Sequence, residues 1–208
     1  MARPICATPQ SSHRGMSPDI LKLKSSIRNQ LRAESKRRAA NRAALSVRMC
    51  TLLEQQAIWQ EAEAVLFYLP AGTEPDIAPL LTKALSEGKT VAIPRYVSEQ
   101  NYYEARRIKD SEHDVVPGQF SMREPHPGCA LVALNQLDLA LVPGVGFDLN
   151  GCRLGRGQGY YDRLLAQVPG HKCGIAFEWQ IVKEIPWEPH DIRLNSILTP
   201  TRWHIVVS

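Results

Sequence analysis

The stretch "GCRLGRGQGYYDRLL", residues 151–165, combines flexible backbone with groups that bind anions. Glycine recurs at every second position over 155–159. Arg153 lies two residues before the first of these three glycines, and Arg156 lies between the first two. Glycine loses more backbone entropy on folding than any other residue, so three within five positions indicate that something approaches the main chain closely. Because arginine side chains bind phosphate well, a phosphorylated ligand is the favoured interpretation.

The surroundings of this loop fit a ligand site. It lies between a continuous apolar run at 137–143, which predicts a buried strand, and a predicted helix at 160–168. Ligands of open α/β sheets bind at the carboxyl ends of strands, where helix N-termini offer unpaired N–H groups. Asp162, in the first turn of the helix, is placed to hold a Mg²⁺ that bridges phosphate oxygens.

The glycine spacing matches neither standard phosphate motif, G-x-x-x-x-G-K-[ST] or G-x-G-x-x-G. Two interpretations of the loop therefore stay open on spacing alone. It is a phosphate-binding loop, or it is a tight connection whose tyrosines pack in the core.

Two helices are predicted before the first strand. From about residue 17, apolar residues at spacings of 3, 4 and 4 predict one buried face, formed by Ile20, Leu23, Ile27 and Leu31. Lys24, Arg28 and Arg32 follow at i, i+4 and i+8 as a basic stripe on a neighbouring face. A second helix is predicted over 42–59, with a buried side near Val47, Cys50, Leu53 and Ile58.

Strands and helices then alternate along the chain. A strand at 64–70, a helix at 75–88 and a strand at 90–96 form a strand–helix–strand unit, which implies parallel strands. The remaining expected elements are a more exposed strand at 101–108, a long irregular loop at 109–136, a strand at 172–177, a short helix at 178–185 and sheet elements at 196–200 and 203–208. We therefore predict an α/β fold: one layered domain over 18–208, with a mostly parallel sheet flanked by helices and two preceding N-terminal helices.

Residues 1–17 show no hydrophobic periodicity and are predicted to be a disordered extension. They contain arginine, serine and threonine but no acid, so they are either a weak targeting segment or lie upstream of a natural start at Met16. The chain holds no apolar run near the roughly 18 residues that span a bilayer, and we expect a cytoplasmic protein without membrane contact.

Charge and cysteine usage narrow the class of protein further. The net charge of +4 is asymmetric, since residues 1–50 carry eleven Lys/Arg against two Asp/Glu. This basic segment could bind nucleic acid, an anionic lipid surface or a phosphorylated small molecule. An equal alternative is that its charges only solvate the surface of a helix. The five cysteines are scattered without a CxxC pair, so we expect reduced thiols, with Cys152 a small core residue rather than a nucleophile.

Residues 138–162 resemble the signature of the 5-formyltetrahydrofolate cyclo-ligase family, also called 5,10-methenyltetrahydrofolate synthetases. That signature runs roughly D-L-x-x-x-P-G-x-x-F-D-x-x-G-x-R-L-G-x-G-x-G-Y-Y-D, and every fixed position is met. Other motifs of the family follow the same order: K-x-x-[LI]-R at 24–28, the loop "YLPAGTEPDI" with Glu74, and "GKTVAIPRY". The C-terminal A-F-x-x-Q and P-x-x-x-x-D are met by Ala176, Phe177, Gln180, Pro186 and Asp191.

The resemblance covers about 20–208 and has three departures. Ser121 stands where the "G-[IV]-x-E-P" loop of the family often has glycine, and Asn195 stands where an acid is common. Pro200 follows Thr199 in place of a frequent glutamate. These changes bear on substrate or metal binding, whereas the central motif is intact.

The resemblance implies an enzyme that uses Mg-ATP to close 5-formyltetrahydrofolate into 5,10-methenyltetrahydrofolate, with release of ADP and phosphate. The formyl oxygen attacks the γ-phosphate, and a neighbouring nitrogen then traps the iminium phosphate as phosphate leaves. Such a reaction needs two substrates held in line and charge neutralised at the transferred phosphoryl group.

The resemblance also implies roles for particular residues. Lys24 and Arg156 would be catalytic, and Asp162 and Asp191 would bind Mg²⁺. ATP would contact Lys24, Arg28, Arg153, Leu154, Gly155, Arg156, Gly157, Gln158, Gly159, Tyr160 and Tyr161. The folate would contact Leu69, Glu74, Phe120, Arg156, Gly157, Gln158, Gly159 and Tyr160.

Several alternatives stay open. Phe120 either stacks on the pterin or benzoyl ring or anchors its loop, and His190 is taken as a surface histidine rather than a base. The protein is expected to be a monomer. It is also expected to bind no nucleic acid, because residues 20–50 lack the aromatic side chains on which the bases of a single strand stack. The rival functions are a non-catalytic folate- or RNA-binding protein and an ATP-dependent ligase for another formamide-like substrate. We expect Arg156→Ala and Asp162→Ala to abolish most turnover and leave the fold intact.

Overall fold

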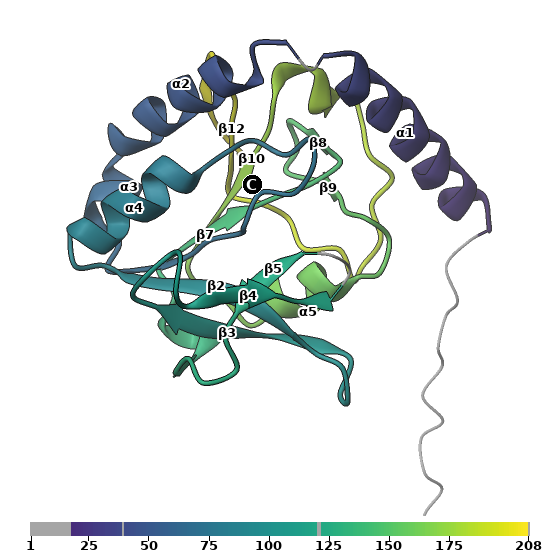
Figure 1. Ribbon diagram of the computed structural model, residues 1–208. Helices are drawn as coiled ribbons and strands as arrows, with labels where there is room; N and C mark the ends of the chain where they lie inside the picture. Colours follow the sequence, from purple (N-terminus) through teal and green to yellow (C-terminus); the bar gives the residue numbers. More distant parts are fainter. Residues whose placement is uncertain (1–17, 39, 120–121, 208) are drawn as a thin grey trace, which may run out of the picture.

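A computed structural model describes residues 18–38, 40–119 and 122–207. The predicted extension 1–17 and two loop positions of interest, Phe120 and Ser121, lie outside the described residues. An eight-stranded sheet crosses the molecule in the order β13-β12-β10-β7-β1-β2-β3-β6 (Figure 1). In chain order its strands are β1 (Ala64–Leu66), β2 (Thr90–Val97), β3 (Tyr102–Ile108), β6 (Leu131–Val132), β7 (Leu139–Val142), β10 (His171–Ile175), β12 (Ser196–Leu198) and β13 (Trp203–Ile205).

The sheet is mostly parallel, as predicted. Strands β12, β10, β7, β1 and β2 pair in parallel, and β13, β3 and β6 join antiparallel at the two edges. The central strands β1 and β7 are buried at every position, because helices or loops cover both faces of the sheet. Strand β1 continues as a buried chain through Phe67 and Tyr68, but its pairing stops at Leu66, short of the predicted 64–70.

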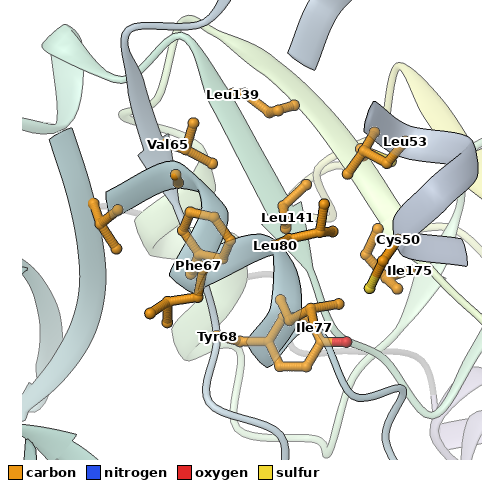
Figure 2. Close-up of a cluster of buried hydrophobic side chains, with 14 of the residues drawn as sticks. Cys50, Leu53, Val65, Phe67, Tyr68, Ile77, Leu80, Leu139, Leu141 and Ile175 are labelled. Carbon is orange, nitrogen blue, oxygen red and sulfur yellow. The ribbon is translucent and has the colours of Figure 1, made fainter. Parts of the chain in front are cut away.

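Two apolar clusters lie on opposite faces of the sheet. On one face, helices α2 (Arg42–Glu54), α3 (Ala57–Glu61) and α4 (Ala78–Ser86) cover the strands. Leu53 and Leu80 from these helices pack on Val65, Leu139 and Ile175 of the sheet (Figure 2). The other face packs against α5 (Tyr160–Leu165) through a second cluster that includes Leu66, Ala140, Val142, Leu164 and Leu165.

Helix α1 (Pro18–Arg37) packs on a separate small sheet, not on the main one. That sheet has the order β11-β8-β9, with β8 (Gly146–Asp148), β9 (Arg153–Leu154) and β11 (Ile181–Val182). Ile27 of the helix packs against Cys152 and Leu154.

The described helices include none that is both long and apolar enough to cross a bilayer.

The predicted apolar face of α1 is wrong at one position. Leu23 is 52% exposed, whereas Lys24 beside it is only 4% exposed. Leu31 is buried as predicted. The helix therefore faces the protein along Lys24, Ile27 and Leu31, and a spacing of 3 and 4 fits this set as well as the predicted one.

The predicted helix at 42–59 is two helices. Helix α2 ends at Glu54 and α3 begins at Ala57, with an extended residue at Gln56 between them. Cys50 and Leu53 are buried as expected, but Val47 is exposed. The bend lets Trp59 reach the core, where its ring packs edge-on against Phe67 at 6.2 Å.

Two further predictions of local structure are wrong. The region 109–136 is not irregular, because β4 (Val115–Pro117) and β5 (Arg123–Pro125) form a hairpin and β6 extends the main sheet. The predicted helix at 178–185 is a 3-10 turn, η3 (Glu178–Gln180), followed by β11. Gln180 explains this, since its side chain accepts the N–H of Phe177 and donates to Gly144, which fixes a turn. A second 3-10 turn, η2 (Leu134–Gln136), precedes β7.

Candidate active site

A cavity of about 1070 Å³ opens at the carboxyl ends of the central strands. Tyr68 and Leu69 line it after β1, and Pro143 and Gly144 line it after β7. This is the edge where open α/β sheets bind ligands. Its volume is at the upper end for small-molecule pockets, so it has room for more than one small ligand.

The glycine loop from β9 to α5 forms one wall of this cavity. Gly157 has φ 108° and Gly159, at the start of α5, has φ 66°. Residues with a Cβ rarely adopt these values, so the backbone itself requires glycine at both positions. At Gly155 a Cβ would lie 2.8 Å from Nη1 of Arg153, so a side chain there would shift the guanidinium that pairs with Asp162.

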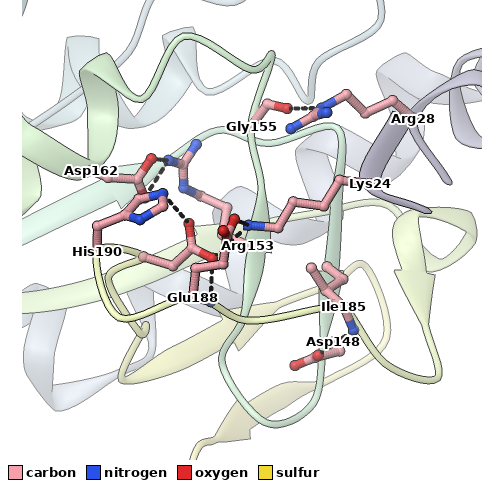
Figure 3. A network of polar contacts seen from close by, with 10 residues as sticks. Lys24, Arg28, Asp148, Arg153, Gly155, Asp162, Ile185, Glu188 and His190 are labelled. Atoms are coloured by element: carbon pink, nitrogen blue, oxygen red, sulfur yellow. Dashed lines mark hydrogen bonds and ion pairs between the residues drawn. The ribbon is translucent and has the colours of Figure 1, made fainter. Parts of the chain in front are cut away.

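Helix α1 supplies two cations to the same cavity (Figure 3). Lys24 Nζ lies 3.0 Å from Glu188 Oε2 and 2.7 Å from Asp191 Oδ2, and all three side chains are largely buried. Arg28 Nε donates to the carbonyl oxygen of Gly155 at 2.8 Å. These contacts join the first helix to the glycine loop and to the C-terminal segment around 188–191.

Arg153 and Asp162 form a second buried ion pair. Nη2 of Arg153 donates to both carboxylate oxygens of Asp162 at 3.0 Å. The guanidinium also lies 5.5 Å from the ring centroid of Tyr161, whose hydroxyl pKa is raised by burial. Nε of Arg153 is buried and has no hydrogen-bond partner among the described residues.

The two proposed Mg²⁺ ligands therefore each contact a cationic side chain. Asp162 is held by Arg153 and Asp191 by Lys24. Both carboxylates line the cavity, and Mg²⁺ in nucleotide sites takes one or two protein carboxylates together with phosphate oxygens and water. The donor set fits such an ion, although the described residues contain no group of three or more His, Cys, Asp or Glu that would hold a metal alone.

Arg156, in the middle of the glycine loop, is 49% exposed and reaches across the cavity. Its Nη2 donates to Glu74 Oε1 at 2.8 Å, and its Nη1 lies 3.5 Å from the sulfur of Met122. The other oxygen of Glu74 accepts the N–H of Ala71 at 3.0 Å. Arg156, expected to contact both ATP and the folate, and Glu74, expected to contact the folate, are thus in direct contact.

A group of tyrosines connects the start of α5 to the hairpin between β2 and β3. The hydroxyls of Tyr160 and Tyr96 both donate to Oδ1 of Asn101, at 2.7 and 2.6 Å. Asn101 has φ 56°, a conformation that asparagine tolerates better than most residues. Tyr103 packs against Tyr160 at 5.7 Å, and burial raises the pKa of Tyr103 to about 12.

The structure shows the surroundings of His190 and Cys152, the two residues considered above as a base and a nucleophile. His190 lines the cavity with an exposed side chain, and its Nε2 lies 3.7 Å from Asp191 Oδ1. Cys152 is buried on the far side of the glycine loop, and burial raises its thiol pKa to about 11. A thiol with that pKa is a poor nucleophile at neutral pH, in agreement with the structural role predicted for Cys152.

Apart from Phe120, which lies outside the described residues, every residue expected at the site lines this one cavity. The lining carries six Lys/Arg side chains and four Asp/Glu side chains. The surplus of cations favours a polyanionic ligand such as a nucleotide triphosphate.

Sequence reasoning missed three carboxylates. Glu188 pairs with Lys24, and nothing in its spacing marked it. Asp148 is fully buried and accepts the N–H groups of Cys152 and Ile185, so it fixes the turn before β9. Glu124 lines the cavity from β5, and the expected "E-P" pair of the long loop was a signal that could have found it.

The fold and the cavity define an α/β protein with a cationic site for a phosphorylated ligand. The model of the 5-formyltetrahydrofolate cyclo-ligase family matches residues 21–200. The 5-formyltetrahydrofolate cyclo-ligase of Mus musculus is 32% identical over 189 residues, which are 83% of this chain and 93% of the mouse protein. That of Mycolicibacterium smegmatis is 34% identical over 143 residues, covering 66% and 74% of the two chains.

A solved structure agrees with these relatives. The NMR structure of the 5,10-methenyltetrahydrofolate synthetase of Aquifex aeolicus has a TM-score of 0.80 and 30% identity, and the match covers 89% of this chain and 94% of that one. This chain belongs to the 5-formyltetrahydrofolate cyclo-ligase family.

Proposed function

We propose that this protein uses ATP to cyclise 5-formyltetrahydrofolate to 5,10-methenyltetrahydrofolate, releasing ADP and phosphate, as one catalytic domain over 18–208. Membership of the family supports the reaction. The observation that carries the proposal is that the glycine loop and both cations of α1, Lys24 and Arg28, line a single cavity. That cavity has room for a triphosphate and for the group that attacks it.

The proposed reaction forms and breaks bonds in two stages. The formyl oxygen attacks the γ-phosphorus, and the bond to the β-phosphate oxygen breaks to release ADP. The neighbouring folate nitrogen then attacks the formyl carbon and loses its proton, and the carbon–oxygen bond breaks to release phosphate, which carries that proton away. The protein acts by orientation and by neutralising charge on the transferred group.

Arg156 and Lys24 are the proposed catalytic cations. Arg156 is the more accessible, since its guanidinium is held only by Glu74 and a methionine sulfur. Turning from Glu74 toward the γ-phosphate would cost little, because the partner is replaced by a phosphate oxygen. Lys24 would exchange its contact with Asp191 for a phosphate oxygen in the same way.

Asp162 and Asp191 would hold Mg²⁺, which neutralises charge on the phosphates when bound. Asp162 would then share its oxygens between the ion and Arg153, whereas Asp191 would turn its oxygens to the ion once Lys24 contacts the phosphate. Arg28 and the loop residues Arg153 to Tyr161 would contact ATP. The folate would contact Leu69, Glu74 and Phe120, together with the loop residues Arg156 to Tyr160.

A monomer in the cytoplasm that binds no nucleic acid remains our expectation for the whole protein. The rival of a non-catalytic folate- or RNA-binding protein receives no support from the relatives, which are named as ligases. A ligase acting on another formamide-like substrate would keep the ATP half of the site. ATP hydrolysis that depends on a different formamide and not on 5-formyltetrahydrofolate would favour that rival.

The test follows ADP release together with the near-ultraviolet absorbance of the methenyl product. Wild-type protein should give both only when ATP and 5-formyltetrahydrofolate are present together. Arg156→Ala should lower kcat by about 10²- to 10³-fold, as when one transition-state donor is removed. The matched control is Arg107→Ala, which changes an exposed arginine of β3 and should keep normal rates. Normal turnover in Arg156→Ala would contradict the assignment of this site.

Asp162 is better tested with asparagine than with alanine. The sequence-based expectation that Asp162→Ala leaves the fold intact does not suit the structure, because Arg153 would keep a buried, unpaired charge. Asp162→Asn preserves the shape and one acceptor oxygen. We expect it to weaken the dependence of turnover on Mg²⁺ concentration, and unchanged dependence would remove Asp162 from the metal site.

A further inference from the structure

Glu124 of β5 is buried in the cavity wall, although one of its carboxyl oxygens has no partner. The residue is 3% exposed. Three buried side-chain atoms lack a hydrogen-bond partner among the described residues, and Oε1 of Glu124 is the sole carboxylate oxygen among them. Since burying a carboxylate is costly without hydrogen bonds, an orphaned oxygen at a cavity wall indicates a ligand donor.

The rest of the carboxylate is held in place. Oε2 lies 3.8 Å from Nη1 of Arg95, and that guanidinium is itself fixed by a 2.6 Å bond to the carbonyl oxygen of Pro125. A Cβ at Gly118 would lie 2.4 Å from the Glu124 carboxyl carbon, so the absence of a side chain there gives the carboxylate its space. Burial raises the pKa of Glu124, whereas the charge of Arg95 and hydrogen bonds from the backbone N–H groups of Tyr96 and Gln119 oppose that rise.

Glu124 lies close in sequence to a residue that contacts the glycine loop. Met122, two residues earlier, contacts Arg156 of the glycine loop. Tyr103, which also lines the cavity and whose pKa is raised by burial and by the charge of Glu124, adds an aromatic ring. The cavity wall from Met122 to Glu124 therefore connects the glycine loop, at Arg156, to the aromatic ring of Tyr103 and the carboxylate of Glu124.

The other carboxylate on this side, Glu74, is less available. Its Oε1 accepts from Arg156 and its Oε2 accepts from Ala71. Asp162 and Asp191 also have cationic partners. Among the four carboxylates of the cavity lining, Glu124 is thus the one with a buried oxygen that accepts no hydrogen bond from the described residues.

The two proposed substrates present different edges to a carboxylate. The pterin ring of 5-formyltetrahydrofolate carries two adjacent donors, the 2-amino group and N3–H, which suit an acceptor-only group. Adenine presents an amino donor beside a ring-nitrogen acceptor, which suits a carboxamide better. A carboxylate at this position therefore distinguishes the pterin from the base of ATP.

We propose that Glu124 is a specificity-determining residue that binds the 2-amino and N3–H edge of the pterin ring. This inference rests on the proposed function and names the part of the site that the folate occupies. It adds a polar contact from β5 to the folate contacts proposed above, which include Glu74.

The test compares Glu124→Gln with wild type in folate binding, turnover and thermal stability. Replacing the carboxylate by an amide puts a donor against two donors, so KM and Kd for 5-formyltetrahydrofolate should rise about 10- to 100-fold. KM for ATP and kcat should stay within about twofold. The melting temperature should be unchanged or higher, because the variant no longer buries an incompletely paired charge.

Two matched variants separate binding from structure. Gly118→Ala keeps the charge but pushes a methyl group into the carboxyl, and we expect the same selective rise in KM for the folate. Glu104→Gln makes the same chemical change on β3, where the carboxylate already pairs with Arg106, and should leave both KM values unaltered. A fall in melting temperature and kcat with unchanged KM would mean that Glu124 has only a structural role.

A substrate analogue gives a readout that does not depend on any variant. Wild type should bind a 2-desamino-2-methyl analogue of 5-formyltetrahydrofolate at least about tenfold more weakly than the parent, and Glu124→Gln should lose most of this discrimination. Equal binding of the two compounds by wild type would overturn the inference. If wild type makes methenyl product but Glu124→Gln keeps its folate KM, the inference alone fails; if wild type makes no product, the proposed function fails and takes the inference with it.

Discussion

Replacement of Lys24 by methionine should destabilise the protein far more than an exposed lysine substitution would. The change removes the cation that lies 3.0 Å from Glu188 and 2.7 Å from Asp191 and leaves two largely buried carboxylates facing each other. Removing one partner of a buried ion pair costs about 3–5 kcal/mol. For a chain of this size, roughly 2–4 °C of melting temperature is lost per kcal/mol, which gives a fall of about 6–20 °C.

The measurement combines urea and thermal unfolding with hydrogen exchange of the α1 amides. Lys22→Met is the control, since Lys22 is exposed on the same helix and its replacement should change the free energy of unfolding by less than about 0.5 kcal/mol. Exchange is included because α1 could undock before the rest of the protein unfolds. Adding Glu188→Gln to Lys24→Met should restore part of the loss. Equal stability and equal α1 exchange in the Lys24 and Lys22 variants would refute the buried network.

Three further changes test the fold. Leu31→Ala should cost about 2–5 kcal/mol in unfolding experiments, and Leu23→Ala less than about 0.5, because Leu31 is buried and Leu23 is exposed; the reverse order would restore the face expected from spacing. Gly157→Ala should cost about 1–3 kcal/mol by calorimetry, since φ is 108°, and a neutral effect would mean that the loop adopts another conformation. Cys173, whose pKa burial raises to about 12, should resist thiol reagents at pH 8 until the protein is denatured, and rapid labelling of the native protein would contradict its burial.

The sheet was predictable because its signals are local. Continuous apolar runs such as 139–142 identify strands buried on both faces, and a helix between two such runs requires parallel pairing. The hairpin of β4 and β5 escaped prediction because its strands have only three residues each. The false helix at 178–185 arose because periodicity does not reveal that the Gln180 side chain bonds to backbone groups of Phe177 and Gly144.

Which residues line the cavity was largely predictable, but the ion pairs that those residues form were not. The resemblance identified Lys24, Arg153, Asp162 and Asp191, all of which line the cavity. It gave no indication that these four form two ion pairs, because the partners of Lys24 lie 164 and 167 residues away. Helical spacing also placed Lys24 in a basic stripe that looked exposed. Spacing gives the position of a residue around the helix axis, but it does not show which other segments cover that face of the helix.

The distance in sequence between Lys24 and its partners has a consequence for biosynthesis. A ribosome makes the first helix early, yet Glu188 and Asp191 emerge only near the end of translation. Until then Lys24 has neither acidic partner, and the part of the cavity wall that Asp191 forms is absent. A nascent chain truncated anywhere before residue 188 should therefore be unable to hold Lys24 in this position, and the catalytic cavity would be among the last parts of the molecule to be completed.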